Sequence, residues 1–162
     1  MKTLTRTFEL DCSAEKFWDV FTDPAYSRAL YLEGLSFKDF RVISADPADR
    51  KLALAPKLNV PGPVAKLLGD AFAYEQHGRL DRTAGVWTWK MVQPGGKKGI
   101  VSSDGTIRVA ATGEGRCRRT DEIHATAHVF GLGGIIESSV EKELLASWDA
   151  ELAFFRRWLA TH

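Results

Sequence analysis

The chain has 162 residues, of which 44% are hydrophobic and 27% are charged. This length and composition predict one globular domain over residues 1–162 with a sizeable core. The formal net charge of +1 argues against nucleic acid as a partner. No window is apolar over the length of a membrane span, and the first residues lack an apolar signal core. At most transient membrane contact and a cytoplasmic location are therefore expected.

The first part of the chain predicts one strand and two short helices. Residues 2–11 alternate between apolar and polar side chains, as in a half-buried strand. Arg6 falls on the apolar side of that strand, so a polar group is expected in the interior. Ser13 suits the N-cap of a short helix, and Pro24 suits the first position of a second one. The second helix is expected to end near Gly34.

From residue 35 to residue 130 the sequence has the period of strands. Turn signals divide this part into six expected strands, at residues 35–46, 50–58, 73–81, 85–93, 100–112 and 116–130. The segment 59–71 contains two prolines and interrupts the series, with room for one helical turn. Consecutive strands with short connections form an antiparallel meander, which normally has one dry face and one wet face.

The C-terminal part predicts a long helix over residues 134–160. Its apolar residues recur at helical spacing, at Ile136, Val140, Leu144, Trp148, Leu152, Phe155 and Leu159. At 1.5 Å per residue this helix would be about 40 Å long. The alternative is a coiled-coil arm of a dimer, but the aromatic residues are bulky for a two-stranded seam. We therefore expect the helix to lie on the sheet, in a monomer or weak dimer.

This order of elements resembles the START/Bet v 1-like (SRPBCC) superfamily, in which an antiparallel sheet wraps around the last helix in a helix-grip fold. The segments FWDVFTDPAY (17–26), PVAKLLGD (63–70), VWTWKM (86–91) and GLGGIIE (131–137) are similar to one bacterial branch, the domain of unknown function 2505 family. The resemblance implies an α+β fold with a seven-stranded sheet and two short helices after the first strand. It also implies a cavity between sheet and long helix for lipids, polyketides or other apolar molecules.

Strand alternation places aromatic and small side chains on the dry face, opposite the apolar stripe of the long helix. The expected ligand-binding residues are Phe72, Tyr74, Trp87, Trp89, Met91, Ala125, Ala127, Trp148 and Phe155. They either fill the core or line an apolar pocket. Three polar residues, Arg6, Gln76 and Asp121, share the inward side. An Arg6–Asp121 ion pair is one expectation, and a ligand's acidic group on Arg6 is another.

The ends of alternate strands of the meander meet at one end of the domain. The breaker-rich segment 59–71 is expected there, beside Lys97. This segment is either the entrance of a lipid-handling cavity or an irregular loop that closes the core. The expected entrance residues are Val60, Val64, Leu67, Leu68 and Lys97.

No spacing of histidines or cysteines indicates a metal or cofactor. His77, His124 and His128 are expected on the wet face, too far apart to share a zinc ion. Cys12 and Cys117 have no metal-ligand spacing and need not pair. Cys117 is expected to be an exposed residue at a hairpin tip, without a histidine–acid partnership that would make it a nucleophile.

Together these patterns favour a protein that binds an apolar small molecule or lipid, with transport of that ligand as an extension of the same role. One alternative is a START-like polyketide cyclase-type enzyme, for which Tyr74, Asp121 and Arg6 are the candidate acid–base groups in the cavity. A second alternative is a protein-interaction module that uses the wet face of the sheet. No catalytic residue and no cofactor is assigned.

Overall fold

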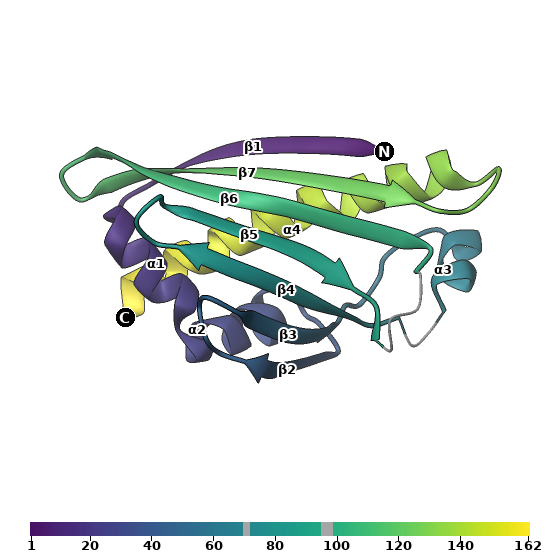
Figure 1. Ribbon diagram of the computed structural model, residues 1–162, viewed down its shortest axis with the longest axis horizontal. Coiled ribbons are helices and arrows are strands. Elements are labelled where there is room, and N and C mark those ends of the chain that lie inside the picture. Colours follow the sequence, from purple (N-terminus) through teal and green to yellow (C-terminus); the bar gives the residue numbers. More distant parts are fainter. Residues whose placement is uncertain (70–71, 95–98) are drawn as a thin grey trace.

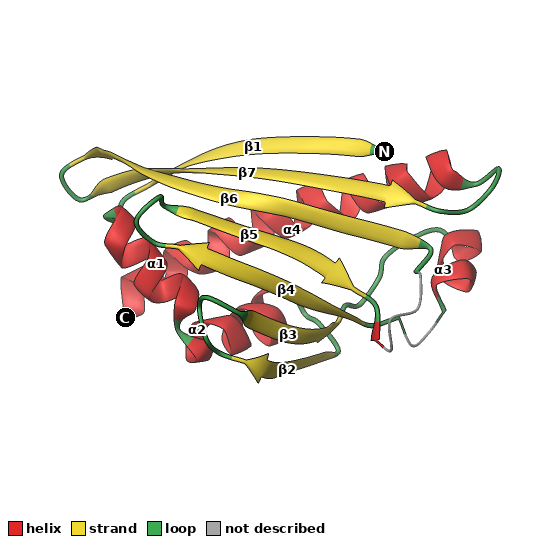
Figure 2. Ribbon diagram, in the orientation of Figure 1, coloured by secondary structure: helices red, strands yellow, loops and turns green. Residues whose placement is uncertain are grey.

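The structure is a computed structural model that describes residues 1–69, 72–94 and 99–162. One antiparallel sheet curves over the long helix α4 (Gly133–Thr161), which runs along its inner face (Figures 1 and 2). The seven strands are arranged in the order β1-β7-β6-β5-β4-β3-β2. The predicted α+β helix-grip fold is confirmed, including the long C-terminal helix.

The sheet contains β1 (Lys2–Leu10), β2 (Asp39–Ser44), β3 (Arg50–Ala55), β4 (Tyr74–Asp81), β5 (Val86–Val92), β6 (Val101–Gly113) and β7 (Arg116–Ala127). The shorter helical elements are α1 (Ala14–Thr22), α2 (Pro24–Ala29), the π-helical turn η1 (Leu30–Gly34) and α3 (Gly62–Leu68). In Figure 1, α1 and α2 cover one end of the sheet, and α3 lies at the other end beside the first turns of α4. Among the described residues, no helix combines the length and apolarity needed to cross a membrane.

Three strands are shorter than the sequence predicts by three or more residues. The strand expected from residue 35 begins at Asp39, since the N–H of Leu35 donates to the Leu30 carbonyl at 2.8 Å and extends η1. The strand expected up to residue 130 ends at Ala127, and Phe130 lies fully in solvent. The strand expected at 50–58 ends at Ala55.

Both predicted helix starts are confirmed. The Ser13 hydroxyl accepts a hydrogen bond from the N–H of Lys16 at 3.0 Å, which caps α1. The Asp23 carboxylate accepts from the N–H of Ala25 at 2.9 Å, and Pro24 follows it as the first residue of α2. The two caps satisfy donors that a helix N-terminus otherwise leaves free.

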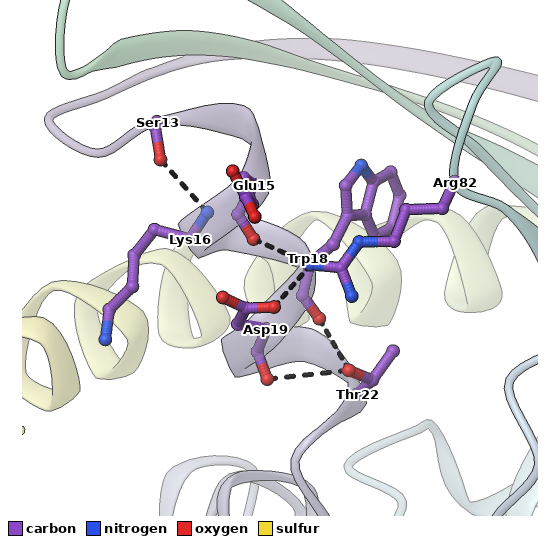
Figure 3. A network of polar contacts seen from close by, with 7 residues as sticks. All are labelled: Ser13, Glu15, Lys16, Trp18, Asp19, Thr22 and Arg82. Atoms are coloured by element: carbon purple, nitrogen blue, oxygen red, sulfur yellow. Dashed lines mark hydrogen bonds and ion pairs between the residues drawn. The ribbon is translucent and has the colours of Figure 1, made fainter.

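Helix α1 is also tied to the sheet by a side chain from the turn between β4 and β5. Arg82 donates to the Glu15 carbonyl at 3.2 Å and forms an ion pair with Asp19 (Figure 3). At the end of the same helix, the Thr22 hydroxyl donates to the Trp18 carbonyl at 2.7 Å. The contacts of Arg82 therefore hold α1 against the turn between β4 and β5.

Two glycines allow close approaches that the sheet and helices need. A Cβ atom on Gly34 would lie 2.9 Å from the ring of Phe154, so this glycine lets η1 touch α4. A Cβ atom on Gly78 would lie 2.1 Å from the indole of Trp87. Gly78 therefore leaves the space over β4 that the Trp87 ring occupies.

The two cysteines lie together inside the protein, so the prediction of an exposed Cys117 is wrong. Cys117 is fully buried because it is on the inward side of β7, opposite Leu10 of β1. Its side chain forms a hydrogen bond with the buried Cys12, and both thiols are free. Burial raises the pKa of both thiols, and the neighbouring Cys12 helps to raise the pKa of Cys117 to about 12.

Replacing Gly78 with alanine should destabilise the protein by about 1–3 kcal/mol, because the added methyl group overlaps the Trp87 ring. Gly62→Ala is the matched control, since nothing lies within 4 Å of a Cβ atom there. Urea unfolding measures both. Equal stability of the two variants would contradict the close packing of Trp87 over β4.

Both native thiols should react slowly with a disulfide reagent, because the thiolate is the reactive form and burial disfavours it. Unfolding in urea should restore ordinary rates, which absorbance of the released thiol reports. The exposed Ser138→Cys variant on α4 provides a fast-reacting control. Native cysteines that react as fast as this control would show that they are accessible.

Candidate functional site

A cavity of about 150 Å³ lies between the inner face of the sheet, the α2–η1 segment and the middle of α4. It is lined by Phe21, Tyr26, Ser27, Leu30, Tyr31, Leu35, Phe37, Arg50, Tyr74, Gln76, Trp87, Trp89, Thr106, Ile107, Arg119, Asp121, Ile123, Leu144, Ser147, Trp148 and Glu151. These residues come from β3 to β7 and from every helical element except α3. The cavity is thus formed where the helices meet the curved sheet.

Aromatic rings form much of the wall. Trp87 and Trp89 enter from β5 and Tyr74 from β4, while Tyr31 and Phe37 come from η1 and the segment that follows it. The Tyr31 and Phe37 rings contact each other with centroids 5.1 Å apart. Flat rings on several sides suit an aromatic or otherwise apolar ligand.

A buried polar network joins α4 to β7 along one side of the cavity. The guanidinium of Arg119 donates to both carboxylate oxygens of Asp121, at 2.7 and 2.6 Å, and to Glu151 of α4 at 2.8 Å. The Trp148 indole N–H donates to Asp121 at 2.9 Å. Arg119, Asp121 and Trp148 are all at least nine-tenths buried. Each charge in this network has a partner of opposite sign, which a buried charge requires.

The network fixes the charge of Arg119. Burial alone would lower the pKa of this side chain, but attraction to Asp121 and Glu151 and the hydrogen bonds to both raise it above its ordinary value. Its guanidinium also lies over the rings of Phe8 and Phe17, each at 5.6 Å. Arg119 therefore acts as a permanently charged connection between the sheet and α4.

A second buried arginine, Arg50, lines the opposite part of the cavity from β3. It donates to the Ser27 hydroxyl at 2.6 Å, and its guanidinium lies 5.0 Å from the ring of Phe21 and 5.4 Å from the ring of Trp87, which also contact each other. Burial lowers the pKa of Arg50 from its ordinary value, and the nearby Tyr31 opposes that change. An arginine starts from so high a pKa that it remains charged in proteins.

Neutral polar groups complete the lining near Arg50. Burial raises the pKa of the Tyr31 and Tyr74 hydroxyls, and Tyr31 forms a hydrogen bond with the Gln76 side chain. Both tyrosines therefore stay protonated at neutral pH and can donate hydrogen bonds to a ligand.

The cavity includes some of the predicted site residues and not others. Those that line it are Tyr74, Gln76, Trp87, Trp89, Asp121 and Trp148. Those predicted for the ligand site that do not line it are Phe72, Met91, Ala125, Ala127 and Phe155. Phe155 instead contacts the ring of Phe17 in the main apolar core, with centroids 5.4 Å apart.

The expected Arg6–Asp121 ion pair is wrong, although the two residues are opposite each other in the β1–β7 register as expected. Arg6 pairs with the exposed Asp149 of α4 instead. The reason is that the oxygens of Asp121 already accept hydrogen bonds from Arg119 and Trp148. Arg6 itself does not line the cavity.

The expected entrance residues lie away from this cavity. Val64 is buried and forms a separate cluster with Val101 and Ile136, which Val60 and Leu68 also contact. Leu67 is exposed. Of the expected entrance, Lys97 is outside the described residues. Residues 59–69 thus contribute to a separate, smaller apolar cluster at the first turns of α4 and do not line the cavity.

Sequence reasoning missed both buried arginines, although strand alternation could have found them. Arg119 is two residues before Asp121 on β7, and Arg50 is two residues before the buried Leu52 on β3. Alternation gives each arginine the same inward side as its neighbour. The lining residues of α2 and η1 carry no comparable signal, because a short helical segment can place several faces inward.

The histidines face outward, as predicted, and form local contacts. His77 pairs with Glu75 at 2.7 Å, and His124 with Asp104 at 2.9 Å. In the described part of the chain, no three His, Cys, Asp or Glu side chains are grouped so that they could hold a metal ion.

Replacing Trp148 with alanine should destabilise the protein by about 3–5 kcal/mol, since it removes a buried ring and one hydrogen bond to Asp121. Trp148→Phe keeps a ring and should cost less, about 1–3 kcal/mol, mainly for the lost indole donor. Leu145→Ala, at a residue 41% exposed on the same helix, is the control. Urea unfolding gives the three values, and a Trp148→Ala value equal to that of Leu145→Ala would place the indole outside the core.

Comparisons with known proteins place this geometry in a family. The model of the family described as "Protein of unknown function (DUF2505)" matches residues 5–159 of this chain. No curated protein matches the chain. The fold itself is found in several solved structures. A protein from Thermus thermophilus has a TM-score of 0.72 at 14% identity, with 99% of each chain covered.

Two further structures have names that state an activity. The Zhui aromatase/cyclase from Streptomyces sp. R1128 has a TM-score of 0.70 at 15% identity, with 96% of this chain and 94% of that chain covered. Norcoclaurine synthase from Thalictrum flavum, in complex with dopamine and hydroxybenzaldehyde, has a TM-score of 0.65 at 21% identity, with 96% and 87% covered. At these identities the likeness shows the Bet v 1-like fold alone. Because the family model spans nearly the whole described chain, the protein belongs to the DUF2505 family, within the Bet v 1-like helix-grip fold.

Proposed function

We propose that the protein binds a small, mainly aromatic or apolar molecule in the cavity between the sheet, η1 and α4. The observation that carries this proposal is the cavity of about 150 Å³, with aromatic rings on several sides and a few polar groups at its edge. Small-molecule sites commonly combine an apolar wall with a small number of placed polar groups.

The size of the cavity limits the class of ligand. An apolar protein cavity of about 150 Å³ can hold benzene. The volume here therefore suits a molecule with one or two aromatic rings, or a short aliphatic chain. A two-chain phospholipid is far larger, so among the expected apolar ligands the smaller aromatic ones fit best.

The names of two similar structures support the same class. One is an aromatase/cyclase, and the other was solved with dopamine and hydroxybenzaldehyde, which are single-ring molecules. Their sequence identity to this chain is low, so they support the kind of ligand and not a particular reaction.

The charges around the cavity favour binding over cyclase-type catalysis. Asp121 and Glu151 are held in ion pairs by Arg119, which leaves neither carboxylate free to act as a base. Burial raises the pKa of Tyr31 and Tyr74, so their hydroxyls serve as hydrogen-bond donors near neutral pH. These groups can orient a ligand without transferring a proton.

Titration calorimetry with a panel of one- and two-ring aromatic compounds tests the proposal. Trp89→Ala should weaken binding of a compound that fits by about tenfold, since a loss of ~60 Å² of apolar contact corresponds to ~1.5 kcal/mol. Lys90→Ala is the matched control, because Lys90 is the next residue on β5 and faces outward. Thermal melting checks that both variants fold. Absence of binding by every compound, or equal loss in both variants, would contradict the proposal.

A further inference from the structure

The two buried arginines of the cavity differ in how their charge is compensated. Arg119 and Arg50 are almost equally buried, with 6% and 7% of their surfaces exposed. Arg119 forms ion pairs with Asp121 and Glu151. Arg50 has no carboxylate within ion-pair distance among residues 1–69, 72–94 and 99–162. Of the two arginines that line the cavity, Arg119 is thus paired with carboxylates and Arg50 has no such partner among the described residues.

A buried charge without a counter-charge is costly, so Arg50 indicates a partner beyond the described residues, for which a bound ligand is suited. Arginine cannot relieve the cost by losing its proton. An apolar side chain would fit the pattern of this strand, because the next two inward residues of β3 are Leu52 and Leu54. A hydrophobic residue at position 50 would continue that pattern.

The contacts of Arg50 hold its side chain in place and leave donors free. The Phe21 and Trp87 rings contact its guanidinium, and Gly78 on the adjacent strand leaves room for the Trp87 ring. Ser27 accepts one hydrogen bond. A guanidinium has five N–H donors, so several of those of Arg50 have no acceptor among the described residues. Arg50 lines the cavity and also a smaller hollow beside Val42 and Ala45.

We propose that Arg50 binds a carboxylate group of the ligand, so that the natural ligand is a small aromatic or short-chain carboxylic acid. This inference rests on the proposed binding function and assigns its ligand class. The fork of a guanidinium matches the two oxygens of a carboxylate, and such charge-assisted pairs are strong inside a protein. Tyr31 and Tyr74 line the same cavity and offer neutral hydroxyl donors to the same group.

Matched acids and amides test the inference by calorimetry at pH 7.5, with 2-naphthoate against 2-naphthamide and benzoate against benzamide as probes. Each pair has the same rings and nearly the same shape, and only the acid carries a charge. Wild-type protein should bind the better-fitting acid at least about tenfold more tightly than its amide, since a hydrogen bond to a charged group contributes ~1.5–3 kcal/mol. Arg50→Gln should remove that preference, because the acid loses far more affinity than its amide.

Arg79→Gln is the matched control, because Arg79 is an exposed arginine on β4 and does not line the cavity. It should keep the preference for the acid. Arg50→Lys, which retains the charge without the fork, should keep part of it. If Arg50→Gln does not fold, the acid-to-amide ratio of the wild-type protein still decides the question.

The outcomes separate this inference from the proposed function. Equal binding of acid and amide by wild-type protein would overturn the carboxylate site and leave small-molecule binding intact. Equal loss of acid and amide affinity in Arg50→Gln would assign Arg50 a structural role and also overturn it. No binding of any of the four probes would count against the proposed cavity function, and the inference would fall with it.

Discussion

The contact between α4 and the sheet depends on one buried charge network. Asp121 of β7 accepts hydrogen bonds from Arg119 and from the Trp148 indole, and Arg119 reaches Glu151 one turn further along α4. Apolar packing alone would allow α4 to lie on the sheet in several rotations about its own axis. The network allows one rotation, because Trp148 and Glu151 must both face β7. It therefore sets which residues of α4 face the cavity and keeps both carboxylates occupied.

The cavity follows from that arrangement and from the shape of η1. The glycine at position 34 lets this turn touch Phe154 of α4, and Tyr31 then faces the sheet across the cavity. A π-helical turn is uncommon and is often found at functional sites. Arg50 lines the same cavity beside the touching rings of Phe21 and Trp87 and, among the described residues, has no carboxylate beside it. The charges on the β7 side thus pair with one another, whereas Arg50 on the β3 side has no carboxylate partner among the described residues.

Much of the architecture was predictable from local patterns. The spacing of apolar residues from Ile136 to Leu159 predicted α4, the N-cap residue Ser13 predicted α1, and Pro24 as a first helical residue predicted α2. Alternation along the strands gave the correct inward side for Trp87 and Asp121. These features depend on residues close together in the chain, which is why a period or a cap in the sequence is enough to indicate them.

The sequence by itself determined the order of elements and the inward side of several strands, β5 and β7 among them, because both follow from spacing along the chain. Only the tertiary structure decided which inward residues meet. Arg6 and Asp121 are opposite each other in register. Asp121 nevertheless pairs with Arg119, two residues away on the same strand, and its oxygens also accept a hydrogen bond from the Trp148 indole. The surroundings of Arg50 likewise depend on three-dimensional packing. Its neighbours Phe21, Ser27 and Trp87 come from α1, α2 and β5, which are distant from β3 in sequence, and none of them is a carboxylate.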